Sequence, residues 1–419
     1  ENMKMKKWTT LSLSAAMALS LAACSGADKP AENTGGDTAG ETQDVTLTVW
    51  APQEDQADDY GNWLGKMEEN FAAAHPEYNI TWKNEVCQEG DVGDKVVQDP
   101  ENSADVYLFA NDQIGKLKDA NAIAELGGKT LDQIKADNSE VVVDSVTQDG
   151  AVYGVPFTTN TWFMYYNKSM VSEDEIKSLD DIIAKNKITF PVSNSWYLPA
   201  FYYADGGTMF GDNGQDAAAG IQFDKPDATE YLVALKNNSN FADDADGKGY
   251  AAFSEKETAV FFSGSWDYQT LKEALGDDLG AAQLPTAKIG GEDKQLYSFA
   301  GSKAIGVNPN CENQAAAVAF AAYLGGEEAQ KAHWEDRMII PTNTTLLEDE
   351  VFAKDMLVKA QNDAVDNTAK IQPTLTEMGN YWKIGENFGK AIMAGDVTEA
   401  NAKDKTAEFQ KQLNTLTEE

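Results

Sequence analysis

Apolar and polar residues alternate where the folded part of the chain begins, and residues 45–50 read VTLTVW. This two-residue period predicts a strand. The following segment, NWLGKMEENFAAAHPEY, places large apolar residues on one helical face and stops at Pro76, so we expect a helix there. A strand at NITWKNEV, a strand at ADVYLFA and a helix at DQIGKLKDANAIAEL continue the alternation. The βαβ order predicts an α/β fold, whose ligands bind beyond the carboxyl ends of the strands.

Two later segments interrupt this alternation, and both are rich in β-branched and aromatic residues. Residues 151–168 and 297–310 are predicted to be extended, with a second α/β pattern between them. An apolar helix is expected over 312–324, and further helices close the chain. We therefore predict two α/β lobes, with the two extended segments crossing from one lobe to the other.

The N-terminal residues have the features of a secretory signal peptide. Lys4, Lys6 and Lys7 precede an apolar run over 11–21, which is shorter than the ~20 residues of a membrane-spanning helix. The run ends in Leu-Ala-Ala-Cys, which resembles the bacterial lipobox. We expect residues 1–23 to be removed and Cys24 to be lipidated, although an ordinary cleavage site beside an incidental cysteine would look similar.

Residues 24–44 contain no aromatic side chain and are rich in small and polar residues, so we expect Cys24 to be followed by a disordered tether. A lipid anchor with a tether predicts a protein held on the extracytoplasmic face of the cell membrane.

Composition narrows the classes of partner and chemistry. The 419 residues favour two or three domains, and the net charge of −36, from 69 acidic and 33 basic residues, argues against a nucleic-acid partner. Two histidines and no nucleophile or phosphate-loop motif leave no catalytic residue to nominate. DADGKGYAAFSE resembles a calcium loop, but Lys248 occupies a ligand position. We expect no metal and no cofactor, and the pairing of Cys87 with Cys311 stays open.

Several motifs occur in an order that is informative. VTLTVW, NSADVYLFANDQIGKL, YGVPFTTNTWFMYYNKSM, ETAVFFSGSWDY and MIIPTN follow one another along the chain. In this order, the chain from Val45 to its C-terminus resembles the family 1 extracellular solute-binding proteins of ABC sugar importers. The segments SWYLPAFYYADGG and QPTLTEMGNYWKIGENFGKAI are most similar to maltose/maltodextrin-binding proteins.

The resemblance implies a type II periplasmic-binding-protein-like fold, in which two α/β lobes are joined by crossing hinge segments and a ligand cleft lies between them. It also implies a monomer that delivers its ligand to an ABC transporter permease. We expect the boundaries as follows: lobe 1 is formed by 45–158 and 305–350, lobe 2 by 162–300 and 357–419, and the hinge by 159–161, 301–304 and 351–356.

The run SWYLPAFYYADGG poses a choice between core and binding surface. Pro199 suits the first turn of a helix, which would bury Phe201 and its neighbours. Trp196 and Tyr197 precede that helix and are free to face a cleft, where an aromatic ring can stack on the C–H face of a sugar. The alternative is that Trp196 belongs to the core.

Two further tryptophans become candidates through the resemblance. Trp266 follows FFSGS, where a strand ends in a turn, and Trp382 lies on an amphipathic helix. The resemblance makes both stacking residues, whereas a helix-borne tryptophan is ordinarily part of the core. Phe109 ends a strand at a position where the family often carries a stacking tryptophan.

Polar candidates follow the predicted strands, because sugar hydroxyls need paired donors and acceptors. Gln53, Glu54 and Asp55 come after the first strand, and Asp112 follows YLFAN. Through the resemblance, Gln113 falls where a ligand contact often lies, and Asn160 replaces an acid of related maltodextrin binders. Any of the acids could equally be a solvated loop residue.

These observations favour a lipid-anchored receptor that captures maltose or malto-oligosaccharides by lobe closure and delivers them to a permease. Two alternative functions are consistent with the same sequence features. One is a binding protein for peptides or another oligosaccharide class. The other is an extracellular glycoside hydrolase, which would need two carboxyl groups about 5–10 Å apart across the scissile bond.

Overall fold

The computed structural model describes residues 41–415. The predicted signal peptide, the lipidation site at Cys24 and nearly all of the predicted tether lie outside the described residues. The first strand, β1 (Gln43–Ala51), begins within the last residues assigned to the tether. Within the described range, no helix is both long and apolar enough to cross a membrane.

Lobe 1 is built on a mixed sheet of six strands in the order β17-β16-β3-β1-β2, with β6 also paired to β16. β1 is parallel to both β2 and β3, as the βαβ pattern predicts. Leu47, Trp63, Phe71 and Phe320 belong to its core, which joins the sheet to helices that are far apart in the sequence. The elements of this lobe include β1, α1 (Gln53–Gln56), α2 (Trp63–Ala74), β2 (Tyr78–Val86), α3 (Val92–Val96), β3 (Val106–Ala110), α4 (Ile114–Asp119), α5 (Gly128–Asp137), α12 (Gln314–Leu324) and α13 (Glu327–Arg337).

Lobe 2 contains two smaller sheets, one with β7 between β12 and β13, and one that pairs β8 with β11. Trp162, Phe190 and Phe201 belong to the larger of its two cores, and Phe163 and Leu271 belong to the other. The elements of this lobe include β7 (Phe163–Asn167), β8 (Ile188–Phe190), α8 (Pro199–Ala204), α9 (Pro226–Asn237), β11 (Phe241–Asp243), α10 (Lys248–Ser254), β12 (Val260–Ser263), α11 (Tyr268–Leu275), β13 (Leu279–Ala282), β14 (Thr286–Ile289), β15 (Glu292–Gln295), α16 (Met356–Asn367), α17 (Gly379–Ala394) and α18 (Ala402–Leu413).

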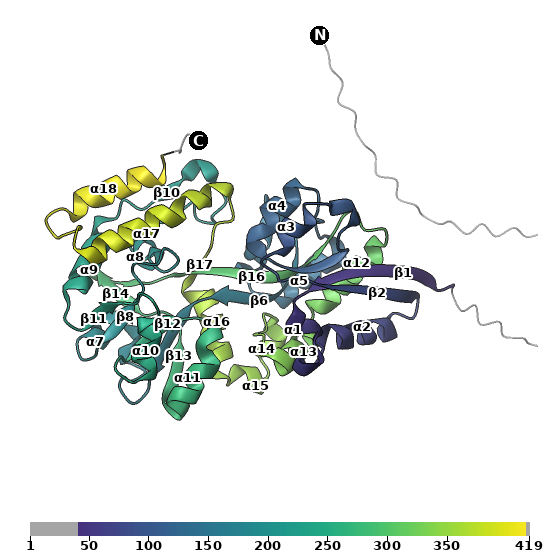
Figure 1. The fold of residues 1–419 in the computed structure, drawn as a ribbon, viewed down its shortest axis with the longest axis horizontal. Helices are drawn as coiled ribbons and strands as arrows, with labels where there is room; N and C mark the ends of the chain where they lie inside the picture. The colour runs from purple at the N-terminus through teal and green to yellow at the C-terminus, as the bar shows by residue number, and fades with distance from the viewer. Residues whose placement is uncertain (1–40, 416–419) are drawn as a thin grey trace, which may run out of the picture. The chain divides into compact units, whose positions relative to one another are not determined.

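The two extended segments cross between the lobes side by side. β6 (Val155–Thr161) and β16 (Ser298–Val307) are antiparallel, and their register pairs Asn160 with Gly301. The far half of β16 pairs with β3 of lobe 1, and its first residues pair with β17 (Ala369–Ile371). Figure 1 shows β6 and β16 running from one lobe to the other. Two of the three predicted hinge segments are thus neighbouring strands, and their hinge role stays a prediction.

Two details differ from the sequence-based expectations. The helix expected over DQIGKLKDANAIAEL is confined to α4, because Asn121 adopts a left-handed φ of 51° that ends the helical path. Ile340 and Leu346, which the expected boundaries assign to lobe 1, pack with Phe163 and Leu271 of lobe 2. The connection between α13 and α16 therefore contributes to the core of lobe 2.

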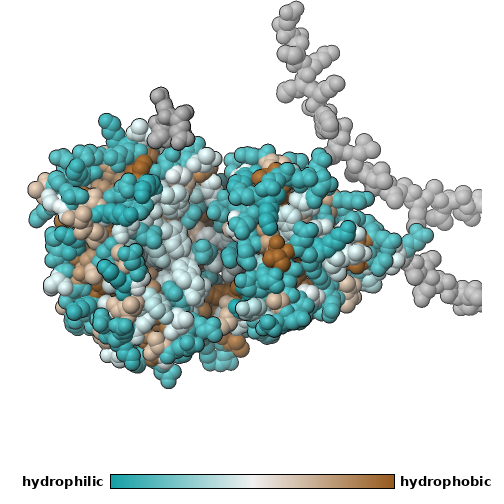
Figure 2. Space-filling view, viewed as in Figure 1, coloured by the Kyte–Doolittle hydropathy of each residue, from teal (hydrophilic) through white to brown (hydrophobic). Residues whose placement is uncertain are grey.

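The face shown in Figure 2 is mostly hydrophilic, as the net charge predicts. Figure 2 shows teal residues over most of the visible face, with small and separate brown areas. Near-neutral residues, drawn white, run down the middle of this face.

Candidate ligand-binding site

The run SWYLPAFYYADGG divides into a packed part and a part that faces the site. Pro199 occupies the first turn of α8, as expected, and the helix ends before Gly206, whose φ of 82° suits glycine. Leu198, Phe201 and Tyr202 are buried in the core of lobe 2. Trp196 lies before the helix and is only partly buried. Local helix geometry thus separates the core rings from the ring that reaches the surface.

Trp196 and Trp266 form an aromatic pair, although 70 positions separate them in the sequence. Their ring centroids are 5.9 Å apart with an interplanar angle of 35°. Trp266 remains 52% exposed, which is unusual for an indole in a folded protein. It lies in a short 3₁₀ helix (Ser265–Asp267) directly after β12. The pair therefore offers exposed aromatic surface to a ligand.

The turn below Trp266 is built around a glycine. A Cβ atom on Gly264 would lie 2.1 Å from the Trp266 ring, so only glycine allows the indole to rest on this backbone. The Tyr165 hydroxyl donates to the Gly264 carbonyl at 2.7 Å, and the Ser263 hydroxyl donates to the Asp267 carboxylate at 2.5 Å. These bonds fix the turn that carries the indole.

Tyr197 packs against Trp196, whereas Trp382 contacts Phe299 and Tyr381. Tyr197 packs on Trp162 at 4.7 Å and meets Trp196 edge-on at 5.3 Å, and burial raises the pKa of its hydroxyl. Trp382 is partly buried on α17 and meets Tyr381 at 5.3 Å. The Tyr381 hydroxyl donates to the carbonyl of Ser195 at 2.6 Å, which ties α17 to the loop that carries Trp196.

A pocket lies where the crossing strands meet the end of β3. It brings together two of the predicted polar residues, Asp112 and Asn160, both of which are exposed to solvent. The protein atoms around Asp112 partly desolvate its carboxyl group and raise its pKa above the ordinary value. The remaining lining residues are Ala110, Asn111, Gly301, Ser302, Lys303, Gln372 and Thr374.

One hydrogen bond links this pocket to the aromatic pair. The Trp196 indole Nε1–H donates to Gln372 Oε1 at 3.0 Å, and Gln372 also lines the pocket. Aromatic surface from lobe 2 and polar groups from lobe 1 and the crossing strands therefore meet in one region. An indole pair beside carboxylate and amide groups can stack on a sugar ring and bond its hydroxyls.

The three residues after β1 are not part of this pocket. Asp55 is fully buried, with His333 Nε2 at 2.7 Å from its Oδ1 and the Arg337 guanidinium donating to the same atom. Burial alone would raise the pKa of Asp55, but His333 and Arg337 outweigh burial and hold it below its ordinary value. Glu54 accepts a bond from Gln88 at 3.2 Å, and Gln53 is exposed on α1. Asp55 is thus an internal ion-pair partner.

Phe109 and Gln113 are also held inside lobe 1. Phe109 has no exposed surface and meets Tyr107 edge-on at 5.7 Å. Gln113 is buried, donates to the Glu89 carbonyl at 2.6 Å and accepts from the Gly93 backbone N–H. Both ends of the Gln113 amide are already bonded to the protein, and the Phe109 ring is fully enclosed. Neither residue therefore presents a group to a ligand here.

The lining residues that sequence reasoning missed include Ser302, Lys303 and Gln372. Ser302 and Lys303 lie in a segment predicted as hinge, and Lys303 Nζ lies 3.7 Å from the buried carboxylate of Glu89. Gln372 lies in the QPTL motif. The available signal was the crossing itself, since side chains of a strand that passes between two lobes must line the space between them.

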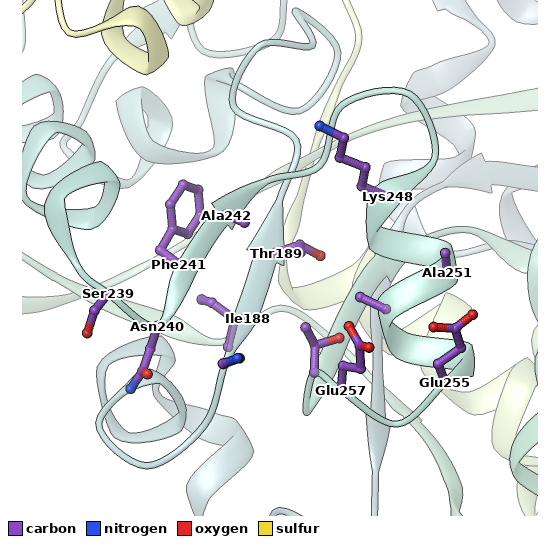
Figure 3. A pocket seen from close by; sticks show the side chains of 13 residues that line it. Ile188, Thr189, Ser239, Asn240, Phe241, Ala242, Lys248, Ala251, Glu255 and Glu257 are labelled. Atoms are coloured by element: carbon purple, nitrogen blue, oxygen red, sulfur yellow. The ribbon is translucent and has the colours of Figure 1, made fainter.

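A larger cavity of about 440 Å³ lies elsewhere in lobe 2, between α10 and the β8–β11 pair. Figure 3 shows Phe241 on the strand side and Ala251 and Glu255 on the helix side. None of the predicted site residues lines it. It lies at the amino ends of β8 and β11, whereas ligands of α/β sheets bind at the carboxyl ends. Size alone therefore does not identify the functional pocket.

In the described part of the chain, no group of three or more metal-binding side chains is placed to hold an ion. Cys87 and Cys311 are both buried and free there.

Similarity to known proteins agrees with this geometry. The family model described as "Bacterial extracellular solute-binding protein" matches residues 66–360. The galactooligosaccharide-binding protein of Bacillus subtilis is 25% identical over 98% of both chains, and the maltodextrin-binding protein MdxE of the same species is 26% identical over 92% of both.

Solved structures share the fold. A protein whose structure was determined with acarbose is 45% identical, with a TM-score of 0.76 over 90% of this chain and 99% of the other. A cyclo/maltodextrin-binding protein complexed with maltotetraose is 18% identical, with a TM-score of 0.74 over 91% of this chain and all of the other. The two-lobe architecture is therefore that of maltose-binding proteins, and the chain belongs to the bacterial extracellular solute-binding protein family.

Proposed function

We propose that this protein is the substrate-binding component of an ABC transporter and that its ligands are maltose and malto-oligosaccharides. The observation that carries the proposal is the exposed Trp196–Trp266 pair, joined through Gln372 to the polar pocket at Asp112 and Asn160. Similarity to a maltodextrin-binding protein and to a structure with acarbose supports this ligand class.

Closure of the lobes is the mechanism that this arrangement favours. The flat C–H face of a glucose unit stacks on the indoles of Trp196 and Trp266, with Tyr197 packed against Trp196 and Trp382 in the same lobe. Asp112 and Asn160 then bond sugar hydroxyls from the opposite side. A ligand that contacts both lobes binds the closed form more tightly, and this difference in affinity shifts the population toward closure.

The same proposal covers the cellular setting. Cys24 carries the lipid anchor, the folded part works as a monomer outside the cytoplasm, and the sugar passes to the permease without chemical change. Relatives in Streptococcus pneumoniae named maltooligosaccharide ABC transporter solute-binding lipoproteins, 25–26% identical, support this setting. Labelling of cells with a radioactive fatty acid tests the anchor, because Cys24→Ala should abolish incorporation.

A second ligand class follows from one specific similarity. The galactooligosaccharide-binding protein matches this chain over 98% of its length. Galactose carries an axial 4-hydroxyl group, which changes the shape of the face that would stack on an indole. Galacto-oligosaccharides are therefore the second candidate.

Titration calorimetry with maltotriose, β-1,4-galactotriose and cellotriose tests the proposal. We expect maltotriose to bind, with a change in tryptophan fluorescence, and chromatography to recover it intact. Binding of galactotriose alone would replace the first ligand class with the second. Release of glucose would show a hydrolase and overturn the proposed function.

A further inference from the structure

We propose that Gln372 is a positioning residue, which holds the Trp196 indole in its binding orientation and couples that orientation to the crossing strands. This inference rests on the proposed function for its effect on sugar affinity. Its structural part concerns the ligand-free protein and can be tested separately.

The Trp196 ring has one polar constraint, which comes from Gln372. The loop that carries Trp196 is fixed by its backbone, since Trp196 N donates to Asn194 Oδ1 at 2.9 Å. The ring itself touches other aromatic rings, Tyr197 edge-on and Trp266 at a tilt. Aromatic contacts tolerate a range of tilts, whereas the 3.0 Å bond from Nε1 to Gln372 Oε1 selects one direction for the N–H.

Gln372 is itself held at the crossing point. Its backbone N–H donates to the Ala300 carbonyl at 2.8 Å, directly after β17 ends at Ile371. The next residue, Pro373, is buried and restricts Gln372 to extended backbone conformations. The neighbour of Ala300 on β16, Gly301, is paired with Asn160 on β6. The amide of Gln372 therefore projects from a backbone that is bonded to the crossing strands.

The position of Gln372 also makes it a bridge between the two halves of the site. Its side chain lines the pocket with Asp112 and Asn160 and bonds Trp196 of lobe 2. A change in the twist of β16 during closure would move Gln372 and, through the hydrogen bond, the Trp196 ring. Holding the ring before the sugar arrives also lowers the entropy lost when the ligand orders it.

Gln372→Met tests this, because methionine has a similar length but offers no strong acceptor. We expect maltotriose affinity to fall about five- to tenfold, in line with the cost of ordering one side chain. Gln372→Glu keeps an oxygen acceptor and should retain the ring orientation. Thermal unfolding of each variant shows whether the fold is intact.

A double-mutant cycle separates positioning from direct contact with the sugar. In a Trp196→Phe background the indole N–H is absent, so Gln372→Met should change affinity by less than about twofold. A full five- to tenfold loss in that background would show that Gln372 acts independently of Trp196 and would overturn the inference.

The ligand-free protein gives a readout that does not depend on the ligand class. The indole ¹H–¹⁵N signal of Trp196, identified by its loss in Trp196→Phe, should lie downfield and move upfield in Gln372→Met but not in Gln372→Glu. An unchanged signal in Gln372→Met would refute the inference even if maltotriose binds. If maltotriose fails to bind the wild-type protein, the proposed function fails while this signal still tests the role of Gln372.

Discussion

Trp266 combines two properties that rarely occur together in one residue, a rigidly built turn and a half-exposed indole. The glycine beneath it and the hydrogen bonds around it fix its backbone, while 52% of its surface stays open. When a ligand covers exposed apolar surface of this size, removing that surface from water favours binding. A residue with this exposure contributes little to the core, so its removal should affect binding far more than folding.

Trp266→Ala should therefore weaken maltotriose binding by about tenfold or more, since aromatic stacking contributes about 0.5–1.5 kcal/mol beyond the buried area. The free energy of unfolding should change by less than about 0.5 kcal/mol. Calorimetry and urea denaturation measure the two effects. Trp334→Phe, at a ring that packs on Phe352, is the matched control and should leave affinity unchanged. Loss of stability with undiminished affinity would place Trp266 outside the site.

Local sequence rules predicted the placement of some site residues but not of those whose neighbours are far away in the sequence. The helix start at Pro199 identified the rings that are free to face the site, because a local rule decided the question. Asp55 could not be assigned in this way, since its partner His333 lies 278 positions away. Phe109 was misleading for a related reason: VYLFA is a strand with successive buried residues, so its last ring faces a core that the local pattern does not reveal.

Among the elements, α1 and α13 (Glu327–Arg337) are joined by a buried charge cluster. Asp55 on α1 meets His333 and Arg337 of α13, and the His333 ring stacks on Trp63 at 3.8 Å. A buried carboxylate that loses its charge leaves its cationic partner uncompensated. The cluster therefore holds the first connection of lobe 1 in place behind the exposed groups of α1.

Asp55→Asn should lower the free energy of unfolding by about 3 kcal/mol at pH 7. Because the folded-state pKa of Asp55 is depressed, its contribution is present above its unfolded pKa of about 3.9 and is lost as pH falls through the folded value. The difference between wild type and variant should accordingly shrink below about pH 4.

Urea denaturation at several pH values measures this difference. Asp59→Asn, at an exposed position of the same connection, is the control and should change stability by less than about 0.5 kcal/mol. A stability difference that stays constant from pH 7 to pH 3 would contradict an ionised Asp55 in the folded state.

At the scale of the whole molecule, the two-lobe architecture was predictable and the composition of the interlobe pocket was only partly so. The βαβ rhythm and the two extended segments indicate lobes and crossings from the sequence. Which side chains of β16 face the pocket depends on its register with β6 and on the irregularity between Lys303 and Ala304. Such an irregularity has no clear local signature, so the sequence does not predict that Lys303 faces the pocket.

Closure changes the dimensions of the whole molecule, so a measurement of overall size tests it. We expect saturating maltotriose to lower the radius of gyration in small-angle X-ray scattering, because the closed form is more compact. Cellotriose, which should not bind, is the control. An unchanged radius with maltotriose bound would indicate capture by an already closed protein and would remove hinge motion from the mechanism.

The placement of β16 limits how this protein can be dissected. Phe299 near its start belongs to a core of lobe 2 and Ile305 belongs to the core of lobe 1, so a single ten-residue strand is shared by both halves. Any truncation that isolates one half strips the other of a strand and leaves open hydrogen-bonding edges, which promote aggregation. The halves are thus one indivisible folding and working unit, and changes to either are best studied by substitution in the intact chain.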